Sequence, residues 1–389
     1  MKTGSKISRA LLGQPMFHIK DLASKLEKMG KTVYHLELGD PDFDSPAAAI
    51  KAATSALVAQ KTNYTSSWGN HDFRETVMSH RLNSDGYDVD LEQVVILPGA
   101  NSGIYWTIRV LVNPGEEVLI PDPGFPSFLA ATIAAGAKPV SYSLDYLNAY
   151  QPSIDNIRGL ITNKTRLLII NSPSNPIGSQ IDQATLKGIY DLCAKYGVHI
   201  LSDDTYKRML FSSTQAGSST VFDQRLNYSF VLGSLSKEFS MSGFRLGYLS
   251  GPREKIEKIK LYIETVNSCV PDFTQAAGRE AILSCDSVRK ENVRKLNDRA
   301  QAFSSKLEIS DRIKLIRPCG GLYVFPRIIG LDMSSVEIAQ VLLNDLNIAC
   351  VPGVYFGHNG EGHLRFSLNQ SSQTLTYLAD QIIHRIERL

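Results

Sequence analysis

The sequence predicts an α/β fold: a doubly wound, mostly parallel sheet followed by a smaller α+β unit. Three observations support this prediction. Short apolar runs alternate with segments of helical periodicity between residues 94 and 250. Some of these runs, such as residues 167–170, are continuously apolar, as is typical of strands covered on both faces. After residue 251 the pattern is helical over a long stretch and then returns to short strands.

The first part of the chain predicts one helix on each side of a short strand. Residues 1–16 are predicted to form an irregular arm, and a helix over residues 17–29 ends at Gly30. A strand is expected at residues 33–38. Ser45 and Pro46 are predicted to cap and open a helix that continues to residue 57.

Seven strands are predicted for the main sheet, with helices between them. The strands are expected at residues 94–97, 117–120, 138–142, 166–170, 198–202, 229–232 and 246–250. The helices are expected at residues 101–112, 126–135 and 182–195.

The last third of the chain predicts three helices and then the smaller unit. The helices are expected at residues 253–267, 271–283 and 287–307, and the last of them is long and charged enough to bridge two domains. Strands at 313–316, 322–326, 348–351 and 363–368 and helices at 334–346 and 372–389 follow. We expect an arm and part of the small domain at 1–44, a large domain at 45–285 and a small domain at 286–389.

Composition excludes several classes of protein. Of the 389 residues, 43% are hydrophobic and 21% are charged, which is typical of globular domains. The net charge is +2 without a dense Lys/Arg block, so no nucleic-acid partner is expected. No apolar run approaches the roughly 20 residues of a membrane span. The five cysteines are odd in number and form no CxxC pair, which argues against a disulfide framework or a metal site and favours reduced thiols in the cytoplasm.

Residues 234–248 contain the strongest candidate for chemistry. Lys237 stands among small hydroxyl residues, and Arg245 follows eight positions later in a Gly-flanked turn. An amine forms a Schiff base with an aldehyde, while hydroxyl and guanidinium groups hold a phosphate. Taken alone, this segment is better described as a Ser-rich loop with a solvated lysine, because isolated lysines are mostly surface residues.

Further candidates follow the predicted strands, where sites in such sheets lie. Small residues at 98–103 open a helix, as at phosphate sites. Phe125 offers a ring for stacking, Asn175 offers a donor to a phenolate oxygen, and Asp203 offers a carboxylate to a pyridinium nitrogen. Each also has a purely structural alternative: a helix start, a core ring, a turn or a cap. Their joint occurrence at strand ends favours the functional interpretation.

Together these motifs make the chain similar to the class I/II aminotransferases, which are fold type I enzymes that use pyridoxal 5′-phosphate (PLP). The resemblance extends from residues 39–43 to residues 365–368 and is most specific at residues 171–178, 203–206 and 234–247. It implies a fold type I PLP-transferase: a large domain around a seven-stranded sheet and a smaller α+β domain built from both chain ends.

The resemblance also implies roles for individual residues. Lys237 would be the Schiff-base lysine and the proton shuttle at the substrate α-carbon, and Asp203 would pair with the pyridine nitrogen. Asn175 and Tyr206 would bond the ring's 3-oxygen, and Phe125, where a Tyr or Trp is more usual, would stack on the ring. The phosphate would be held by Ala100, Asn101, Ser234 and Arg245, assisted by Ser236.

Three further residues are implied to serve the substrate and a second subunit. Arg365 would grip the substrate α-carboxylate through a bidentate pair, with Asn175 and the backbone of Gly39 lining the same carboxylate. Tyr64 matches a tyrosine that reaches the phosphate of a partner subunit, so the resemblance implies a homodimer with shared active sites.

The implied activity is transfer of the α-amino group of an L-amino acid to a 2-oxo acid. The same residues would also serve a PLP-dependent elimination, cyclisation, decarboxylation or α-carbon oxidation, because fold does not determine function. A third possibility is a sensing domain of a DNA-binding regulator. It requires a DNA-binding module, for which residues 1–40 are too short and not basic enough.

Overall fold

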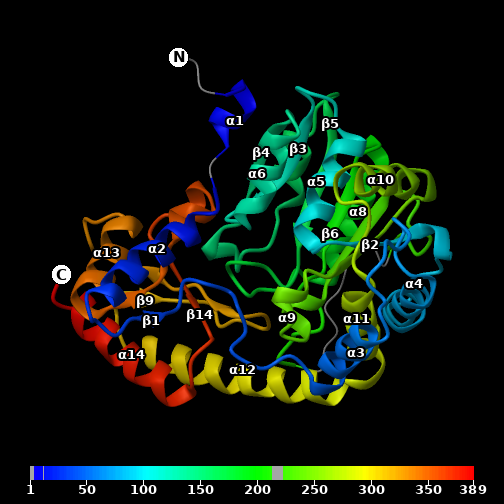
Figure 1. The fold of residues 1–389 in the computed structure, drawn as a ribbon. Helices are drawn as coiled ribbons and strands as arrows, with labels where there is room; N and C mark the ends of the chain where they lie inside the picture. The colour runs from blue at the N-terminus through cyan, green and yellow to red at the C-terminus, as the bar shows by residue number, and fades with distance from the viewer. Residues whose placement is uncertain (1–3, 12, 213–221) are drawn as a thin grey trace.

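The computed structural model describes residues 4–11, 13–212 and 222–389, and a seven-stranded sheet lies at its centre (Figure 1). The strand order is β2-β8-β7-β6-β5-β3-β4, and β8 runs antiparallel to both of its neighbours. This confirms the predicted mostly parallel, seven-stranded α/β sheet. The strands are β2 (Val94–Leu97), β3 (Glu117–Asp122), β4 (Lys138–Ser143), β5 (Thr165–Asn171), β6 (His199–Asp203), β7 (Ser229–Ser234) and β8 (Gly247–Ser250).

Helices cover both faces of this sheet, which explains why its strands are continuously apolar. On one face, α5 (Ala100–Leu111), α6 (Pro126–Ala134) and α10 (Arg253–Val266) pack in one hydrophobic cluster with residues of β2, β3, β5, β6, β7 and β8. On the other face, α7 (Ile154–Leu160) and α8 (Gln183–Tyr196) cover the β3–β6 side. There α4 (His71–Val77) and α11 (Asp272–Ser284) cover β2 and β7.

The smaller part of the fold combines the two ends of the chain. Leu36, near the N-terminus, packs in one cluster with apolar residues from the last hundred positions, including Leu364 and Phe366. β1 (Tyr34–His35) pairs in parallel with β12 (Ile348–Ala349). The smaller part of the fold also contains β9 (Ile313–Lys314), β10 (Tyr323–Val324), β11 (Arg327–Ile328), α13 (Ser335–Leu346), β13 (Val351–Pro352), β14 (Leu364–Ser367) and α14 (Ser372–Ile386).

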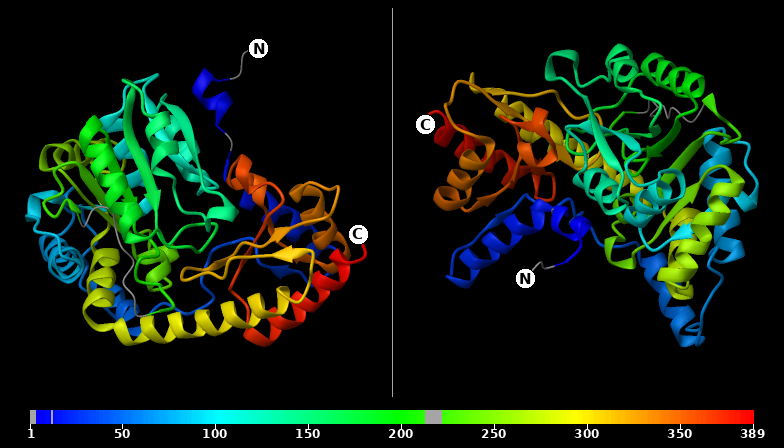
Figure 2. Two further views of the ribbon diagram at one scale, coloured as in Figure 1. Left: turned by 180° about the vertical axis from the view of Figure 1, so that it is seen from behind. Right: turned by 90° about the horizontal axis from the view of Figure 1, so that it is seen from above.

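One long helix, α12 (Asp286–Leu307), runs along both parts of the fold (Figures 1 and 2). Leu296, Ala300 and Phe303 of this helix pack into the cluster of the smaller part. The helix thus occupies the bridging position that its length and charge predicted. The domain boundaries that we placed at residues 45 and 286 stay a prediction.

Two expectations for the N-terminal region were wrong. The arm at residues 1–16 is not wholly irregular, because a short helix, α1 (Lys6–Ala10), precedes α2 (Pro15–Lys28). Ser45 does not cap α3 (Ala47–Val58): its hydroxyl donates to the carbonyl oxygen of Ser240 at 2.6 Å, and Pro46 is the N-cap residue. The tertiary contact with the segment after Lys237 takes precedence over the local cap.

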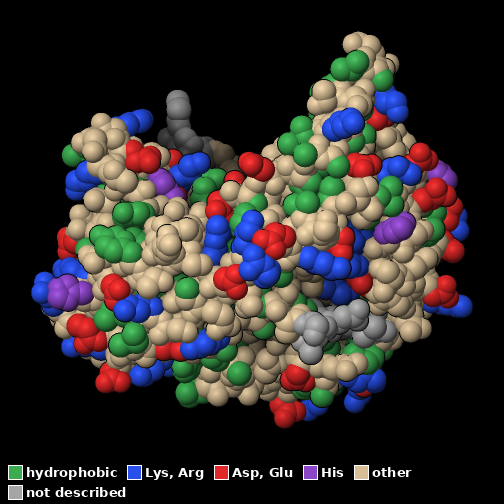
Figure 3. All heavy atoms as spheres, turned by 90° about the horizontal axis from the view of Figure 1, so that it is seen from below, with side chains coloured by type: hydrophobic (Ala, Val, Ile, Leu, Met, Phe, Trp, Pro, Cys, Tyr) green, Lys and Arg blue, Asp and Glu red, His purple; other side chains and the backbone are tan. Residues whose placement is uncertain are grey.

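The surface carries charges of both signs. On the face shown in Figure 3, Lys and Arg side chains lie among Asp and Glu rather than in one basic patch. No helix in the described part of the chain has the length and apolar character needed to cross a bilayer.

Candidate active site

One cavity of about 520 Å³ lies where the carboxyl ends of the parallel strands meet the smaller part of the fold. In the register of β5 and β6, Asn171 pairs with Asp203, so the two strands bring their last residues side by side. All the predicted site residues except Tyr64 line this cavity: Gly39, Ala100, Asn101, Phe125, Asn175, Asp203, Tyr206, Ser234, Ser236, Lys237, Arg245 and Arg365.

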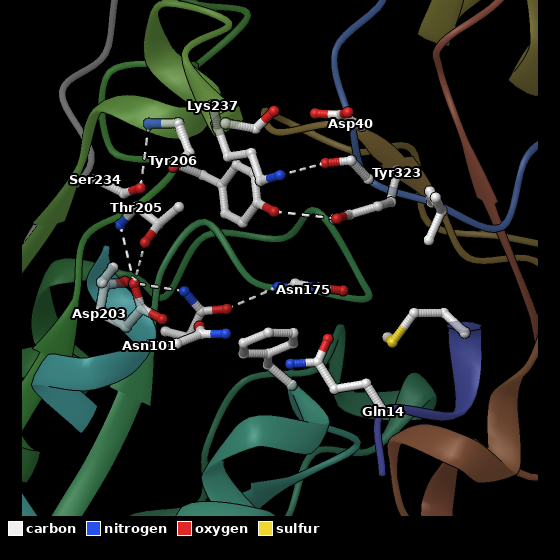
Figure 4. Close-up of a pocket in the computed structure, with 18 of the residues that line it drawn as sticks. Gln14, Asp40, Asn101, Asn175, Asp203, Thr205, Tyr206, Ser234, Lys237 and Tyr323 are labelled. Carbon is white, nitrogen blue, oxygen red and sulfur yellow. Dashed lines mark hydrogen bonds between the residues drawn. The ribbon is translucent and has the colours of Figure 1, made fainter. Parts of the chain in front are cut away.

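Lys237 lies on a single helical turn, α9 (Leu235–Glu238), directly after β7. Ser234 is the N-cap residue of this turn, and its hydroxyl accepts a hydrogen bond from the amide of Ser236 at 3.3 Å. Nζ of Lys237 donates to the carbonyl oxygen of Gly39 at 2.5 Å (Figure 4). The amine therefore points across the cavity toward the smaller part of the fold.

Close packing against Tyr323 requires a glycine at position 39. A Cβ atom built on this residue would lie 1.7 Å from the hydroxyl oxygen of Tyr323. That hydroxyl is also 3.1 Å from the hydroxyl of Tyr206, so the two phenols share a hydrogen bond in the lining of the cavity (Figure 4). Tyr206 is buried, and burial raises the pKa of its phenol well above 10.

Asp203 is a fully buried carboxylate that ends β6. Burial raises its pKa to about 6, although hydrogen bonds from the amide (3.1 Å) and hydroxyl (2.6 Å) of Thr205 to Oδ1 act in the opposite direction. Its other oxygen accepts no hydrogen bond from the described residues. A buried carboxylate in this condition is stabilised by a cationic donor.

The other end of the cavity is built to hold an anion. Ala100 and Asn101 form the first turn of α5, whose N-cap residue, Gly99, supplies no side chain to its N–H groups. Arg245 has left-handed backbone geometry (φ 51°) and donates from Nη1 to the carbonyl oxygen of Ser242 at 2.8 Å. A Cβ on Gly99 would lie 2.5 Å from Nη2 of Arg245, so a larger residue there would displace the guanidinium. Helix N–H groups beside a guanidinium are typical of phosphate sites.

Arg365 is 1% exposed and lies at the side of the cavity formed by the smaller part. Its guanidinium carbon lies 4.2 Å from the ring centre of Tyr323 and 4.9 Å from that of Phe356. Nη1 donates to Oδ1 of Asn175 at 3.1 Å, and Nη2 donates to the carbonyl oxygen of Glu37. Further N–H groups of this side chain remain for another acceptor.

Phe125 contributes one wall. It is the N-cap residue of α6, and its ring meets the ring of Phe128 edge-on at 5.8 Å. Gln14 Nε2 donates to the hydroxyl of Ser127 at 3.0 Å, which connects the start of α2 to α6.

Sequence reasoning missed several residues of the cavity. Tyr323 follows the pair Gly320-Gly321, a signal of close backbone approach that was available. The residues of α2 gave no such signal, because only the tertiary fold brings a helix near the N-terminus to this edge of the sheet. The residues that our prediction did not include are Gln14, Met16, Phe17, Lys20, Leu38, Asp40, Asn171, Thr205, Ser242 and Tyr323.

Tyr64 does not belong to this cavity within the chain. Its side chain is 87% exposed and lies on the surface. Its predicted part in a partner's site is taken up below.

The cavity therefore fits one kind of group. A carboxylate with an open oxygen, an aromatic wall, a phenol pair, an amine and an anion site surround a single space, as an aromatic, cationic, phosphate-bearing aldehyde requires. PLP is such a group, and fold and site together are those of a PLP-dependent enzyme.

Comparison with known proteins specifies the family. The model of the family "Aminotransferase class I and II" matches residues 31–382. An aspartate aminotransferase of Pyrococcus horikoshii is 34% identical over 95% of this chain and 93% of its own. Aromatic-amino-acid aminotransferase 2 of Thermococcus litoralis is 31% identical over 93% and 92%. The solved aromatic aminotransferase of Pyrococcus horikoshii superimposes with a TM-score of 0.89 at 28% identity, covering 94% and 99%.

The chain belongs to the class I and II aminotransferases. It is a transferase that moves amino groups between amino acids and 2-oxo acids, and PLP is its cofactor. The elimination and oxidation reactions that the residues alone left open find no support among these relatives, which carry aminotransferase names.

Proposed function

We propose that the cavity holds PLP through the residues that the sequence singled out. Asp203 would receive the protonated ring nitrogen, which accounts for a buried carboxylate at the edge of the cavity. Asn175 and Tyr206 would bond the 3-oxygen, and Phe125 would lie against the ring face. The first turn of α5, Ser234, Ser236 and Arg245 would hold the phosphate.

Bound PLP supplies an electron sink for the charge that develops when the α-proton leaves. The protein's part is to position groups and to move that proton. Nζ of Lys237 would take the proton from the α-carbon of the amino acid and return it on the cofactor side, acting as a general base and then as a general acid. Its reach across the cavity to Gly39, 2.5 Å away, supports this role.

The substrate α-carboxylate would bind Arg365. Its planar guanidinium is held by the rings of Tyr323 and Phe356 and by Asn175, so it is pre-oriented for a two-point contact with a carboxylate. The same contact serves the amino donor and the 2-oxo acceptor, because both carry this carboxylate.

We propose L-aspartate as the amino donor. The carrying observation is Lys20 on α2, which lines the cavity and forms no ion pair within the described ranges. An ammonium group in this wall suits a second carboxylate on the substrate. The 34% identical aspartate aminotransferase of Pyrococcus horikoshii supports this assignment.

The test is kcat/KM for a panel of L-amino acids with 2-oxoglutarate, for the wild type and Lys20→Met. We expect L-aspartate to lead the panel and to lose about three- to fivefold in the variant, since Lys20 is exposed and an exposed ion pair contributes up to about 1 kcal/mol. Lys187→Met, on the exposed surface of α8, is the matched control. A Lys20→Met variant with unchanged L-aspartate kinetics contradicts the proposal.

An aromatic donor is the second candidate, and Phe17 favours it. This ring lines the cavity yet is 53% exposed, so it offers an apolar contact at the mouth. Two aromatic aminotransferases are among the similar proteins described above. In this case L-tyrosine and L-phenylalanine lead the panel, and Phe17→Ala, not Lys20→Met, lowers their kcat/KM.

We further propose a homodimer in which Tyr64 reaches the phosphate end of the partner's cavity. The exposure of this large ring supports a contact that a single chain does not make. Sedimentation velocity tests the state, and mixing tests the sharing: refolding inactive Tyr64→Ala with inactive Lys237→Ala should restore activity in mixed dimers. A fully active monomer contradicts both statements.

We propose a cytoplasmic location, which the cysteines support. All five carry free thiols, and Cys193, Cys285 and Cys350 are buried, as is usual for proteins of reducing compartments. Fractionation of cells that produce the protein tests this placement.

A further inference from the structure

Glu37 is a fully buried carboxylate that the reaction described above does not use. It follows β1 and is 0% exposed. Its Oε1 lies 2.8 Å from Nδ1 of His35, while Oε2 has no hydrogen-bond partner among the described residues. A buried carboxylate needs a positive neighbour, because desolvation of an unpaired charge is costly.

His35 is that neighbour. Its second ring nitrogen, Nε2, lies 3.1 Å from Oε1 of Glu27, so each nitrogen faces a carboxylate oxygen. A neutral imidazole carries one N–H and can donate to only one of them, whereas imidazolium donates to both. The geometry therefore favours the protonated ring. Burial alone would lower the pKa of His35, but the hydrogen bonds to Glu37 and Glu27 outweigh it and raise the pKa above 6.5.

The same residue, Glu37, contacts the substrate end of the cavity. Its carbonyl oxygen accepts a hydrogen bond from Nη2 of Arg365. Nε of Arg365 is buried without a partner in the described residues. Burial lowers the pKa of Arg365, and the negative charge of Glu37 is among the groups that oppose this effect.

Three other titratable side chains interact with Arg365: Cys350, Tyr206 and Tyr323. Cys350 interacts electrostatically with both Glu37 and Arg365, and burial raises the pKa of its thiol. Burial likewise raises the pKa of Tyr206, and Tyr323 contributes a phenol. Glu37 is the carboxylate that acts on Arg365 from this side, and His35 and Glu27 are connected to Arg365 through it.

We propose that Glu37 and His35 set the strength with which Arg365 binds the substrate α-carboxylate. When His35 is protonated, its charge compensates that of Glu37, and the guanidinium is left to the substrate. When His35 loses its proton, the carboxylate of Glu37 competes with the substrate for the positive charge of Arg365. Both residues act through Arg365 and are positioning residues. The inference rests on the proposed role of Arg365.

The pH dependence of KM, measured with the holoenzyme, tests the proposed effect of Glu37 and His35 on Arg365. The probe is 2-oxoglutarate, which carries the α-carboxylate and no titrating amine, over about pH 6 to 9, across the range in which a histidine titrates. In the wild type we expect KM to rise with pH by about three- to tenfold, the scale of one unit charge in partly buried surroundings, with kcat little changed. Glu37→Gln should give a low and pH-independent KM, and His35→Gln a high one at every pH. Glu257→Gln, an exposed change on α10, is the control and should follow the wild type.

Unfolding provides a readout that is independent of turnover. Because the pKa of His35 is raised in the folded protein, its contribution to stability is complete below pH 6.5 and is lost as pH rises through the folded pKa. This loss should be smaller in Glu37→Gln. If Glu37→Gln does not fold, His35→Gln carries the test.

Two results would overturn the inference: Glu37→Gln and the wild type giving the same KM profile, or His35→Gln matching the wild type at every pH. Failure of the proposed function has another signature. In that case Arg365→Lys leaves KM for 2-oxoglutarate unchanged, whereas failure of this inference alone leaves the Arg365→Lys defect intact.

Discussion

The amine of Lys237 donates a hydrogen bond to the carbonyl oxygen of Gly39, 2.5 Å away, across the boundary between the large sheet and the smaller part of the fold. One residue follows β7, and the other precedes the first helix of the large part, almost two hundred positions earlier in the chain. The cavity is thus closed by two segments that only the tertiary fold brings together. Substitutions on either side should affect the same site.

Gly39→Ala should disrupt this contact. The new Cβ would lie 1.7 Å from the Tyr323 hydroxyl, so either the backbone or the ring must move. We expect a loss of at least about tenfold in kcat/KM, since misplacement of about 1 Å at a reacting centre costs as much or more. Steady-state kinetics measure it. Gly159→Ala, whose Cβ meets no atom within 4 Å, is the control and should be nearly neutral.

Asp203→Asn should change how the stability of the apoprotein depends on pH. The raised pKa, about 6 against 3.8, means that the folded apoprotein binds this proton more tightly than the unfolded chain, so the wild-type apoprotein loses stability as pH rises from about 4 to 6. The loss amounts to about 2–3 kcal/mol. Asn carries no charge, so the variant apoprotein should not show this loss.

Bound PLP should have the opposite effect on the relative stability of the wild type and Asp203→Asn. The protonated ring nitrogen stabilises the Asp203 carboxylate in the wild type, so PLP should raise the unfolding temperature of the wild type more than that of Asp203→Asn. Scanning calorimetry of apo and loaded forms at several pH values measures both effects. An equal gain from PLP in the two proteins would remove Asp203 from the ring nitrogen.

Much of this site follows from local sequence signals, and the remainder does not. Asp203, Asn175 and Lys237 each end a strand or follow one closely, so strand periodicity alone brings them to one edge of the sheet. Lys20 and Glu37 could not be assigned in this way. Lys20 has the ordinary appearance of a helix surface residue, and nothing in the chain order indicates that α2 faces the cavity.

The helices and strands likewise divide into those that local sequence signals predict and those that they do not. The strands of the main sheet begin and end within about two residues of the prediction, because buried parallel strands have uniform apolar runs. The short helices α1, α4 and α7 were missed, since their sequences are mixed in polarity and their ends are set by packing. Ser45 shows the limit of capping signals: a tertiary hydrogen bond to Ser240 takes its hydroxyl.

The ion pair behind the catalytic turn should be important for stability. Glu238, next to Lys237, accepts from Nη2 of Arg81 at 2.8 Å, and both side chains are 7% exposed. Arg81→Ala should lower the free energy of unfolding by up to about 3–5 kcal/mol, because it leaves the buried carboxylate of Glu238 with only the longer, 3.8 Å contact to Arg289. Arg225→Ala, which removes a pair with Asp88 whose side chains are both 75% exposed, should cost less than about 1 kcal/mol. Urea titration measures both, and equal losses would show that burial does not decide the effect.

The central claim is that Lys237 moves the α-proton, and exchange of that proton measures it most directly. In D₂O with L-aspartate and no acceptor, NMR follows replacement of the α-hydrogen by deuterium, alongside L-tyrosine and L-alanine so that the result does not depend on the donor. We predict exchange in the wild type and a fall of about 10²-fold or more in Lys237→Ala, the scale of a general base. Lys187→Ala should exchange as the wild type does. Near-normal exchange in Lys237→Ala, with PLP bound, would contradict the account.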